Sequence, residues 1–277
     1  MGRAKLHHIP GYAWHLTHRC HDKAFLLKFA RDKRRWLHWL FEAKKRYGLV
    51  ILGYTITSNH IHLLVYDTGR DQVISRSILL TASRTAREYN IRKDRSGAFW
   101  EDHYHATAVE TETHLREGLI YVELNMVRAG VVDHPKNWPF GTYSEIFGGR
   151  QRYRLVDTAT LMRLLGIGSR ELLKAAYDSW IREKLSRGTN EREPKWTESI
   201  AVGGERFVVE IKERLGVRAA TSRIIPAYEG RTGTGPDREE GASYILREND
   251  DPYGSILMGK KGLLSNSVKL GAFTIDL

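Results

Sequence analysis

The sequence His60-Ile61-His62 could place two imidazoles on one metal ion. In an extended strand, residues i and i+2 project from the same face, so His60 and His62 can share a ligand while Ile61 enters the core. The pair follows Ser58-Asn59, a polar dipeptide that predicts a tight turn between two strands. Two half-buried surface histidines are the plain alternative, because the same spacing recurs in His103-Tyr104-His105.

A second candidate is Tyr121, which precedes Asn125 by four residues. On a helix this spacing stacks the two side chains on one face. Neither residue belongs to the apolar stripe of the segment, so we expect neither to be needed for the core. The tyrosine could be a nucleophile and the carboxamide a metal ligand. A snorkelling tyrosine beside a solvated asparagine is the alternative, and the spacing alone favours it. The apolar stripe consists of Leu115, Leu119, Val122 and Met126.

The elements that must position these residues follow the order β-α-β-β-α-β-α. Hydrophobic periodicity predicts strands at 12–19, 49–57, 60–66 and 103–110, and helices at 23–47, 71–90 and 112–129. The first six elements predict an α+β fold with a ferredoxin-like antiparallel sheet and helices packed on one face. The helix at 112–129 is an addition that covers the other face or the edge. The first helix should bury a stripe formed by Phe25, Phe29, Trp36, Leu40 and Tyr47.

The chain divides into two expected parts. We expect residues 1–150 to form the domain that carries these candidate residues, and residues 151–277 to form a mainly helical C-terminal extension. Helices are expected near 157–165, 169–185 and 204–215, and a loop at 231–241, where Gly and Pro are frequent. The segment 134–149 mixes Pro, Gly and aromatic residues, which is typical of a wrapping segment or a boundary.

Composition narrows the class of protein. The 277 residues include 44 Lys and Arg against 33 Asp and Glu, a net charge of +11, and 41% hydrophobic residues, enough for a packed core. Residues 1–150 hold 23 basic and 15 acidic residues, a net of +8, which indicates a domain facing a polyanion or a charge that only keeps the protein dissolved. Cys20 is the single cysteine, which excludes an intrachain disulfide and fits a reducing cytoplasm. We expect no secretory signal, and no stretch of 18 apolar residues predicts a membrane span.

Taken together, these segments resemble the single-tyrosine HUH transposases, and within them the REP-associated tyrosine transposases. The resemblance is strongest over residues 10–147 and thin beyond 150. It is carried by GYAWHLTHR, YTITSNHIHLLVY, FWEDHYHATAVE, YVELNMVRAG and WPFGTYSEI, with FVVEIKERLGVRA and YILREND similar to longer members.

The resemblance implies a site and a reaction. His60, His62 and Asn125 would hold a divalent ion, Mn²⁺ or Mg²⁺, and Tyr121 would attack a DNA phosphodiester to form a 5′-phosphotyrosine. The substrate would be single-stranded or hairpin DNA, and the C-terminal extension is a candidate for further DNA contacts. The family usually has Asn-Pro-Val after the tyrosine, where this chain has Asn125-Met126-Val127, and Pro-Asn where it has Ser58-Asn59. Related enzymes include monomers and homodimers, so the oligomeric state stays open.

The chemistry suits these residues. A phenol with a pKa near ~10 is a poor nucleophile at neutral pH, and a hard divalent cation that polarises the phosphate demands less of it. Two imidazoles and an amide oxygen leave ligand positions open and suit Mn²⁺ or Mg²⁺. Two other functions remain: a DNA-binding protein whose catalysis has decayed, and a metal hydrolase in which His60 and His62 activate a water molecule.

Overall fold

The computed structural model describes residues 8–69, 72–148, 152–188, 191–227 and 242–248. Within them, seven strands form one sheet in the order β2-β3-β1-β4-β5-β7-β6. The strands are β1 (Ala13–Arg19), β2 (Val50–Ile56), β3 (His60–Tyr66), β4 (His105–Val109), β5 (Ala201–Gly203), β6 (Arg223–Pro226) and β7 (Tyr244–Arg247). The helices are α1 (Ala30–Tyr47), α2 (Val73–Arg92), α3 (Thr113–Glu123), α4 (Asn125–Arg128), α5 (Thr142–Phe147), α6 (Thr158–Leu164), α7 (Arg170–Ser186), α8 (Lys195–Glu198) and α9 (Glu205–Leu215).

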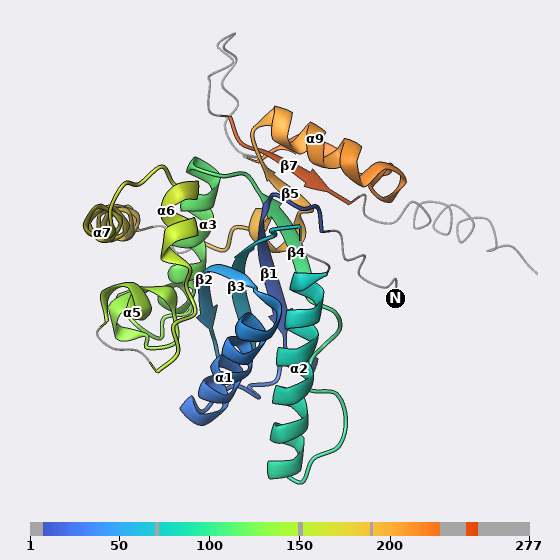
Figure 1. Ribbon diagram of the computed structural model, residues 1–277, viewed down its shortest axis with the longest axis vertical. Coiled ribbons are helices and arrows are strands. Elements are labelled where there is room, and N and C mark those ends of the chain that lie inside the picture. Colours follow the sequence, from blue (N-terminus) through green and yellow to red (C-terminus); the bar gives the residue numbers. More distant parts are fainter. Residues whose placement is uncertain (1–7, 70–71, 149–151, 189–190, 228–241, 249–277) are drawn as a thin grey trace, which may run out of the picture.

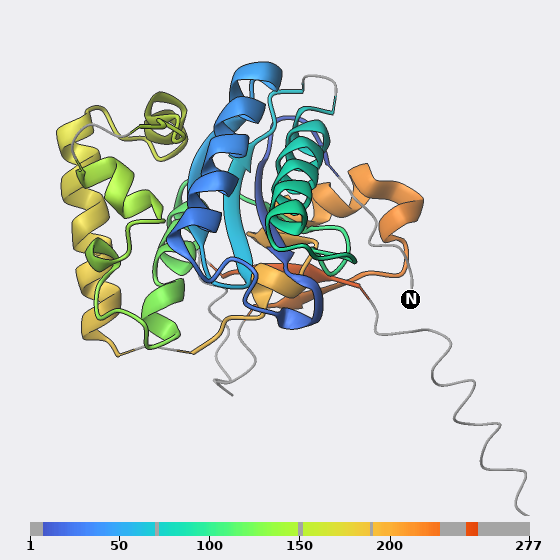
Figure 2. The same ribbon diagram turned by 90° about the horizontal axis from the view of Figure 1, so that it is seen from below.

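The first half of the chain is the expected ferredoxin-like unit. Its strands lie in the order β2-β3-β1-β4, and each neighbouring pair is antiparallel. Helices α1 and α2 pack side by side on one face of this sheet (Figure 2). Leu16 pairs with Leu63 across β1 and β3, and both are fully buried. The predicted α+β fold is therefore confirmed.

Helix α1 is shorter than the sequence pattern predicts. It begins at Ala30 rather than near residue 23, because Asp22 and Lys23 adopt positive φ angles of 51° and 56° that interrupt a right-handed helix. Phe25 and Phe29 therefore precede the helix and are 66% and 57% exposed, so their expected place in the buried stripe is wrong.

Helix α3 covers the other face of the sheet. It packs against β2 at Gly53, where a Cβ atom would lie 2.8 Å from Leu119 Cδ2, so only glycine lets the two elements approach this closely. The segment predicted as one helix over 112–129 is divided at Leu124 into α3 and the single turn α4. Gly130, with φ 66°, follows the turn.

The C-terminal part adds both helices and strands. The three helices expected there are present as α6, α7 and α9, and Figure 1 shows α5, α6 and α7 grouped beside β2 while α9 lies beyond β4. The sequence pattern did not predict β5, β6 and β7. Strand β5 pairs in parallel with β4, so the second half of the chain extends the sheet of the first. The loop expected at 231–241 lies outside the described residues. No helix in the described ranges has the length and apolar character needed to cross a bilayer.

Candidate active site

An open pocket of about 300 Å³ lies where α3 and α4 meet the sheet. It contains all four residues that the sequence singled out, although these come from two separate segments. The described lining residues include no Asp or Glu, so the pocket is suited to an anion. They are Thr17, Arg19, His60, His62, Tyr121, Asn125, Arg128, Ala129, Arg192 and Thr197.

His62 is the buried centre of the pocket, 2% exposed. In the β1–β3 register it lies opposite Thr17, and in the β2–β3 register opposite Thr55, so all three share the face that α3 covers. Its Nδ1 lies 2.9 Å from Nε2 of His15, and its Nε2 lies 2.9 Å from Nδ2 of Asn125. Both ring nitrogens of His62 therefore have polar neighbours inside the protein.

His60 is held from the turn that precedes β3. Its Nδ1 lies 2.9 Å from Thr57 Oγ1 and 2.7 Å from Asn59 Oδ1. Its ring is nearly perpendicular to that of His62, at 80°, with the centroids 4.9 Å apart. The turn thus occupies Nδ1 of His60 and leaves Nε2 as the nitrogen for a ligand in the pocket.

Tyr121 lies beside His62 and beside His15, the buried histidine that contacts His62. Its ring centroid is 5.8 Å from that of His62 and 6.0 Å from that of His15. The residue is only 4% exposed, so the expectation that Tyr121 contributes nothing to the core is wrong. It fills space beneath Trp196, a residue that belongs to the C-terminal part of the chain.

Arg128, in the single turn α4 that follows α3, contacts both the ring and the backbone of Tyr121. Its guanidinium carbon lies 4.1 Å from the centre of the Tyr121 ring, and its Nη2 donates a hydrogen bond of 2.7 Å to the Tyr121 carbonyl oxygen. In a continuous helix that oxygen would accept from the amide of Asn125. The division of the helix at Leu124 therefore frees a carbonyl that Arg128 uses to hold the backbone of Tyr121.

Burial sets the protonation of the pocket. It lowers the pKa of His60 to about 4, with the nearby Arg19 and Arg128 acting in the same direction. It also lowers the pKa of His62 well below its ordinary value, helped by the charges of its neighbours. Both imidazoles are therefore neutral at pH 7, as a metal ligand must be.

The pKa of the Tyr121 phenol shifts in the opposite direction. Burial raises the pKa of Tyr121, while the positive charges of Arg128 and Arg192 partly offset that rise. A neutral, buried phenol is a weak nucleophile. Any attack by Tyr121 therefore depends on electrophilic help at the group attacked.

The side chains of the pocket suit a divalent cation that takes only a few of its ligands from the protein. In the described part of the chain, no group of three or more His, Cys, Asp and Glu could hold a metal ion. An ion here would rest on Nε2 of His60, Nε2 of His62 and the amide of Asn125, with the oxygen rather than the nitrogen of that amide facing it. Such a set leaves positions for water and substrate oxygens, as Mn²⁺ and Mg²⁺ sites commonly do.

Several lining residues were missed by sequence reasoning. Arg128 had a usable signal, because it lies one turn after Asn125 on the same segment. Arg192 and Thr197 had none, since they follow Tyr121 by more than 70 residues and reach the pocket only through the docking of α8. His15, which contacts His62 from β1, has no signal in the sequence beyond its place in the segment GYAWHLTHR.

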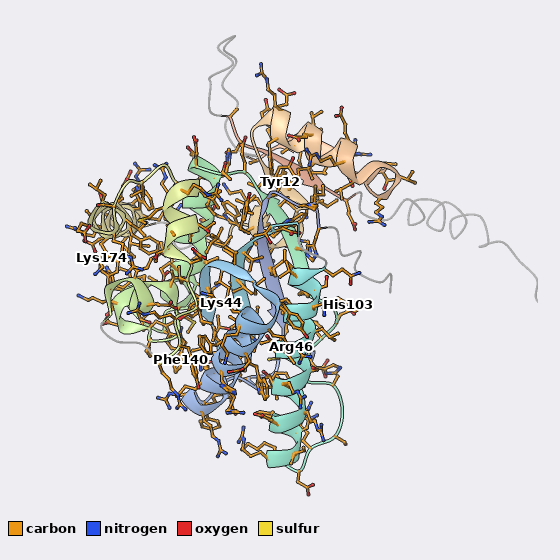
Figure 3. The ribbon with its side chains drawn as sticks, in the orientation of Figure 1. Tyr12, Lys44, Arg46, His103, Phe140 and Lys174 are labelled. Carbon is orange, nitrogen blue, oxygen red and sulfur yellow. The ribbon has the colours of Figure 1, made fainter. Side chains whose placement is uncertain are left out.

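Other candidates lie outside the pocket. His105 bonds through Nε2 to the Ser199 carbonyl oxygen at 3.0 Å, and His103 precedes β4 on the α2 side of the molecule (Figure 3). Glu123, on the same helix as Tyr121, is 4% exposed and accepts hydrogen bonds from Tyr177 and Tyr143. Its contacts are with α5 and α7 rather than with Tyr121.

A mixed sheet that brings a tyrosine, two histidines and a carboxamide into a basic pocket defines a protein that could act on phosphodiesters. Residues 9–125 match the model of the family described as "Transposase IS200 like". The matched region begins before β1, contains β1 to β4 and ends at Asn125. Over these residues, which are less than half of the chain, the protein is similar to the IS200-like transposases, and this match supports a transposase-like enzyme that processes DNA.

The solved structures that are similar to the chain include two that are each 17% identical to it. One is described as the REP-associated tyrosine transposase bound to a REP hairpin; the similarity covers 57% of this chain and 98% of that one, with a TM-score of 0.44. The other is a protein from Deinococcus radiodurans R1 described as a transposase, with coverage of 42% and 89% and a TM-score of 0.31. No curated protein matches the chain.

Proposed function

We propose that this protein is a transposase-like, metal-dependent endonuclease and strand transferase that cuts single-stranded or hairpin DNA through a 5′-phosphotyrosine. The observation that carries the proposal is the convergence of Tyr121, His60, His62 and Asn125 in one basic pocket. In this proposal Tyr121 is the nucleophile, and the other three hold Mn²⁺ or Mg²⁺.

The reaction assigns a task to each group. The Tyr121 oxygen attacks the phosphorus and releases its proton to water, the bond from phosphorus to the 3′ oxygen breaks, and that oxygen takes a proton from water and leaves as a 3′-OH. The bound cation would polarise the phosphate, which compensates for a phenol whose pKa burial has raised. Arg128 holds the ring and backbone of Tyr121, and Arg19 and Arg192 add positive charge where the phosphate would lie.

The phosphotyrosine retains the energy of the broken phosphodiester. A 3′-OH can attack it later, so strands can be rejoined without a nucleotide cofactor. This distinguishes strand transfer from simple hydrolysis, in which the bond energy is lost to water.

The preference for unpaired DNA rests on the shape of the pocket and on the resemblance in sequence. Tyr121 is nearly buried beneath Trp196, so the scissile phosphate has to enter the pocket rather than lie on a surface. A flexible single strand or the base of a hairpin can bend into it more easily than a regular duplex. The basic lining predicts binding that weakens as salt rises, because phosphate contacts release counterions.

We also propose that residues 1–150 form the catalytic domain and residues 151–277 an extension. The role of the extension is not limited to distant contacts with DNA. Arg192 and Thr197 line the pocket from the second part. We therefore assign this extension a share in the site itself in addition to any contacts with DNA further away.

The decisive experiment is to trap the covalent intermediate. The full chain is incubated with single-stranded hairpins and Mn²⁺, and adducts are digested and mapped. We expect DNA on the peptide that contains Tyr121, a free 3′-OH on the upstream fragment, and no adduct with Tyr121→Phe. Tyr104→Phe is the matched control, because Tyr104 is another buried tyrosine, 5% exposed, whose hydroxyl lies 3.3 Å from Ser75 Oγ and away from the pocket.

Two outcomes would overturn the proposal. Cleavage by Tyr121→Phe that leaves ordinary 5′-phosphate ends would support the metal hydrolase with an activated water. Tight binding of DNA by the wild-type protein without any adduct or cleavage, in Mn²⁺ or Mg²⁺, would support a DNA-binding protein that has lost catalysis.

A further inference from the structure

A chain of hydrogen bonds connects the pocket to a backbone carbonyl of the C-terminal part. The Trp196 carbonyl oxygen lies 2.7 Å from Nδ1 of His15, and Nε2 of His15 lies 2.9 Å from Nδ1 of His62. The two rings are nearly parallel in plane, at 7°, and the residues are 1% and 2% exposed. Bulk water therefore does not compete for these bonds.

The Trp196 carbonyl oxygen fixes the order of donors and acceptors along this series of hydrogen bonds. A carbonyl oxygen can only accept, so Nδ1 of His15 carries the proton. A neutral imidazole has one N–H, so Nε2 of His15 is an acceptor and Nδ1 of His62 must donate to it. Nε2 of His62 is then the nitrogen that carries the lone pair, and Nδ2 of Asn125 lies 2.9 Å from it.

We infer that His15 is a positioning residue that fixes His62 in the tautomer able to bind a metal ion through Nε2. The inference rests on the proposed function for the role of the metal, but the tautomer itself is a property of the protein alone. Metal-ligating histidines commonly donate their other N–H to a partner that sets ring orientation and basicity. Here that partner is a second histidine rather than a carboxylate or carbonyl.

Among the residues that the structure describes, the other neighbour of His62 Nδ1 cannot take over this task. Thr17 Oγ1 is 3.4 Å away, a longer contact, and a hydroxyl can donate as readily as it accepts. It would therefore tolerate either tautomer of His62. The Trp196 carbonyl oxygen, which can only accept, imposes a direction through His15, and Asn125 Nδ2, which can only donate, favours the same tautomer from the Nε2 side.

The carbonyl is itself held firmly. The Trp196 side chain is fully buried, its Nε1 donates to Glu193 Oε2 at 3.0 Å, and its ring packs on Gly118, where a Cβ atom would lie 3.3 Å from the ring. Trp196 lies 71 residues beyond the end of the family match at Asn125, since 196 − 125 = 71. Docking of α8 therefore determines which nitrogen of His62 is available.

The test compares three full-length variants. His15→Phe keeps the ring volume and removes both nitrogens, whereas His15→Gln restores an acceptor for His62 and a donor for Trp196. His18→Phe is the matched control, because His18 is also buried and bonded to a backbone carbonyl, that of Asp102 at 2.9 Å, but faces α2 instead of the pocket.

The first readout is the tautomer of His62 in metal-free protein, measured by long-range ¹⁵N–¹H NMR correlations. We expect the proton on Nδ1 in the wild type and in His18→Phe, and a mixture with protonated Nε2 in His15→Phe. A proton on Nε2 of His62 in the metal-free wild type would overturn the inference. This readout requires neither metal nor DNA, so it gives its answer even where the proposed cleavage fails.

The second readout is Mn²⁺ affinity without DNA, measured by electron paramagnetic resonance. His15→Phe should bind Mn²⁺ about 10- to 100-fold more weakly, the range found for partners of metal ligands. His15→Gln should recover most of that loss, and His18→Phe should show none. Unchanged Mn²⁺ affinity in a folded His15→Phe would also overturn the inference, and recovery in His15→Gln separates positioning from a loss of packing.

Discussion

The two faces of the sheet are made by the same strands but have different chemistry. Leu16, Ile61 and Leu63 point toward α1 and α2 and are at most 1% exposed. Their neighbours His15 and His62 point toward α3 and α8. Because side chains alternate along a strand, each strand can stabilise the fold on one side and build a site on the other. Stability and chemistry are thus assigned to adjacent residues.

The helices that cover the faces differ in the same way. Helices α1 and α2 have 18 and 20 residues and seal one face continuously. The other face is covered by α3, the single turn α4 and α8, which has four residues. Interrupted cover leaves room for the open pocket, and it exposes Asn125 and Arg128 in part at its edge.

The largest effect should come from a residue on the pocket face. His60→Ala removes one proposed ligand from a position that is only half-buried, so the fold should survive while cleavage is lost. Chelation of metal by EDTA should have the same effect on the wild type, and added Mn²⁺ should restore only the wild type. Adduct formation on a hairpin measures both. His105→Ala, from the second His-x-His segment, is the control and should retain most of the activity; a metal site at His105 would contradict the comparison.

A smaller effect, of the opposite kind, should come from the next residue. Ile61→Ala removes a side chain that is 1% exposed on the face covered by α1 and α2. Deleting such a side chain typically costs about 2–5 kcal/mol of unfolding free energy. Chemical denaturation should show this loss, while Mn²⁺ affinity of the folded protein stays near the wild-type value. If Ile61→Ala instead weakened Mn²⁺ binding as strongly as His60→Ala, the two faces would not be independent.

Local patterns in the sequence identified the parts of the molecule that depend on near neighbours. Period-two and period-3.6 patterns predicted β1 to β4 and most helices, and the His60–His62 spacing placed both imidazoles on one face correctly. The short strands β5 to β7, of three or four residues, carry too little pattern to be recognised. The start of α1 was misjudged because positive φ angles at Asp22 and Lys23 are not visible in hydrophobic periodicity.

The rest of the candidate site depends on long-range docking. Thr197 and Arg192 enter the pocket because α8 packs against β4, and no local pattern links those residues to Tyr121. The burial of Tyr121 has the same origin, since Trp196 covers it. A helical stripe predicts which side chains face one neighbour, but here a second neighbour buries residues that the stripe leaves out.

The smallest effect should come from a buried polar residue that lies near the pocket face but outside the pocket. Glu123 accepts hydrogen bonds from Tyr177 Oη at 2.6 Å and from the Tyr143 amide at 3.0 Å, and burial raises its pKa to about 7 from an ordinary 4.5. The folded protein therefore holds this proton more tightly than the unfolded chain does. The stabilisation is complete below pH 4.5 and is lost as pH rises toward 7, a change on the order of 1–3 kcal/mol.

Glu123→Gln stays neutral, so its unfolding free energy relative to wild type should increase between pH 5 and pH 8. Denaturation curves at the two pH values measure the difference, and DNA cleavage by Glu123→Gln should remain near wild type. A loss of cleavage in a stable Glu123→Gln would instead place this carboxyl group in the chemistry of the site.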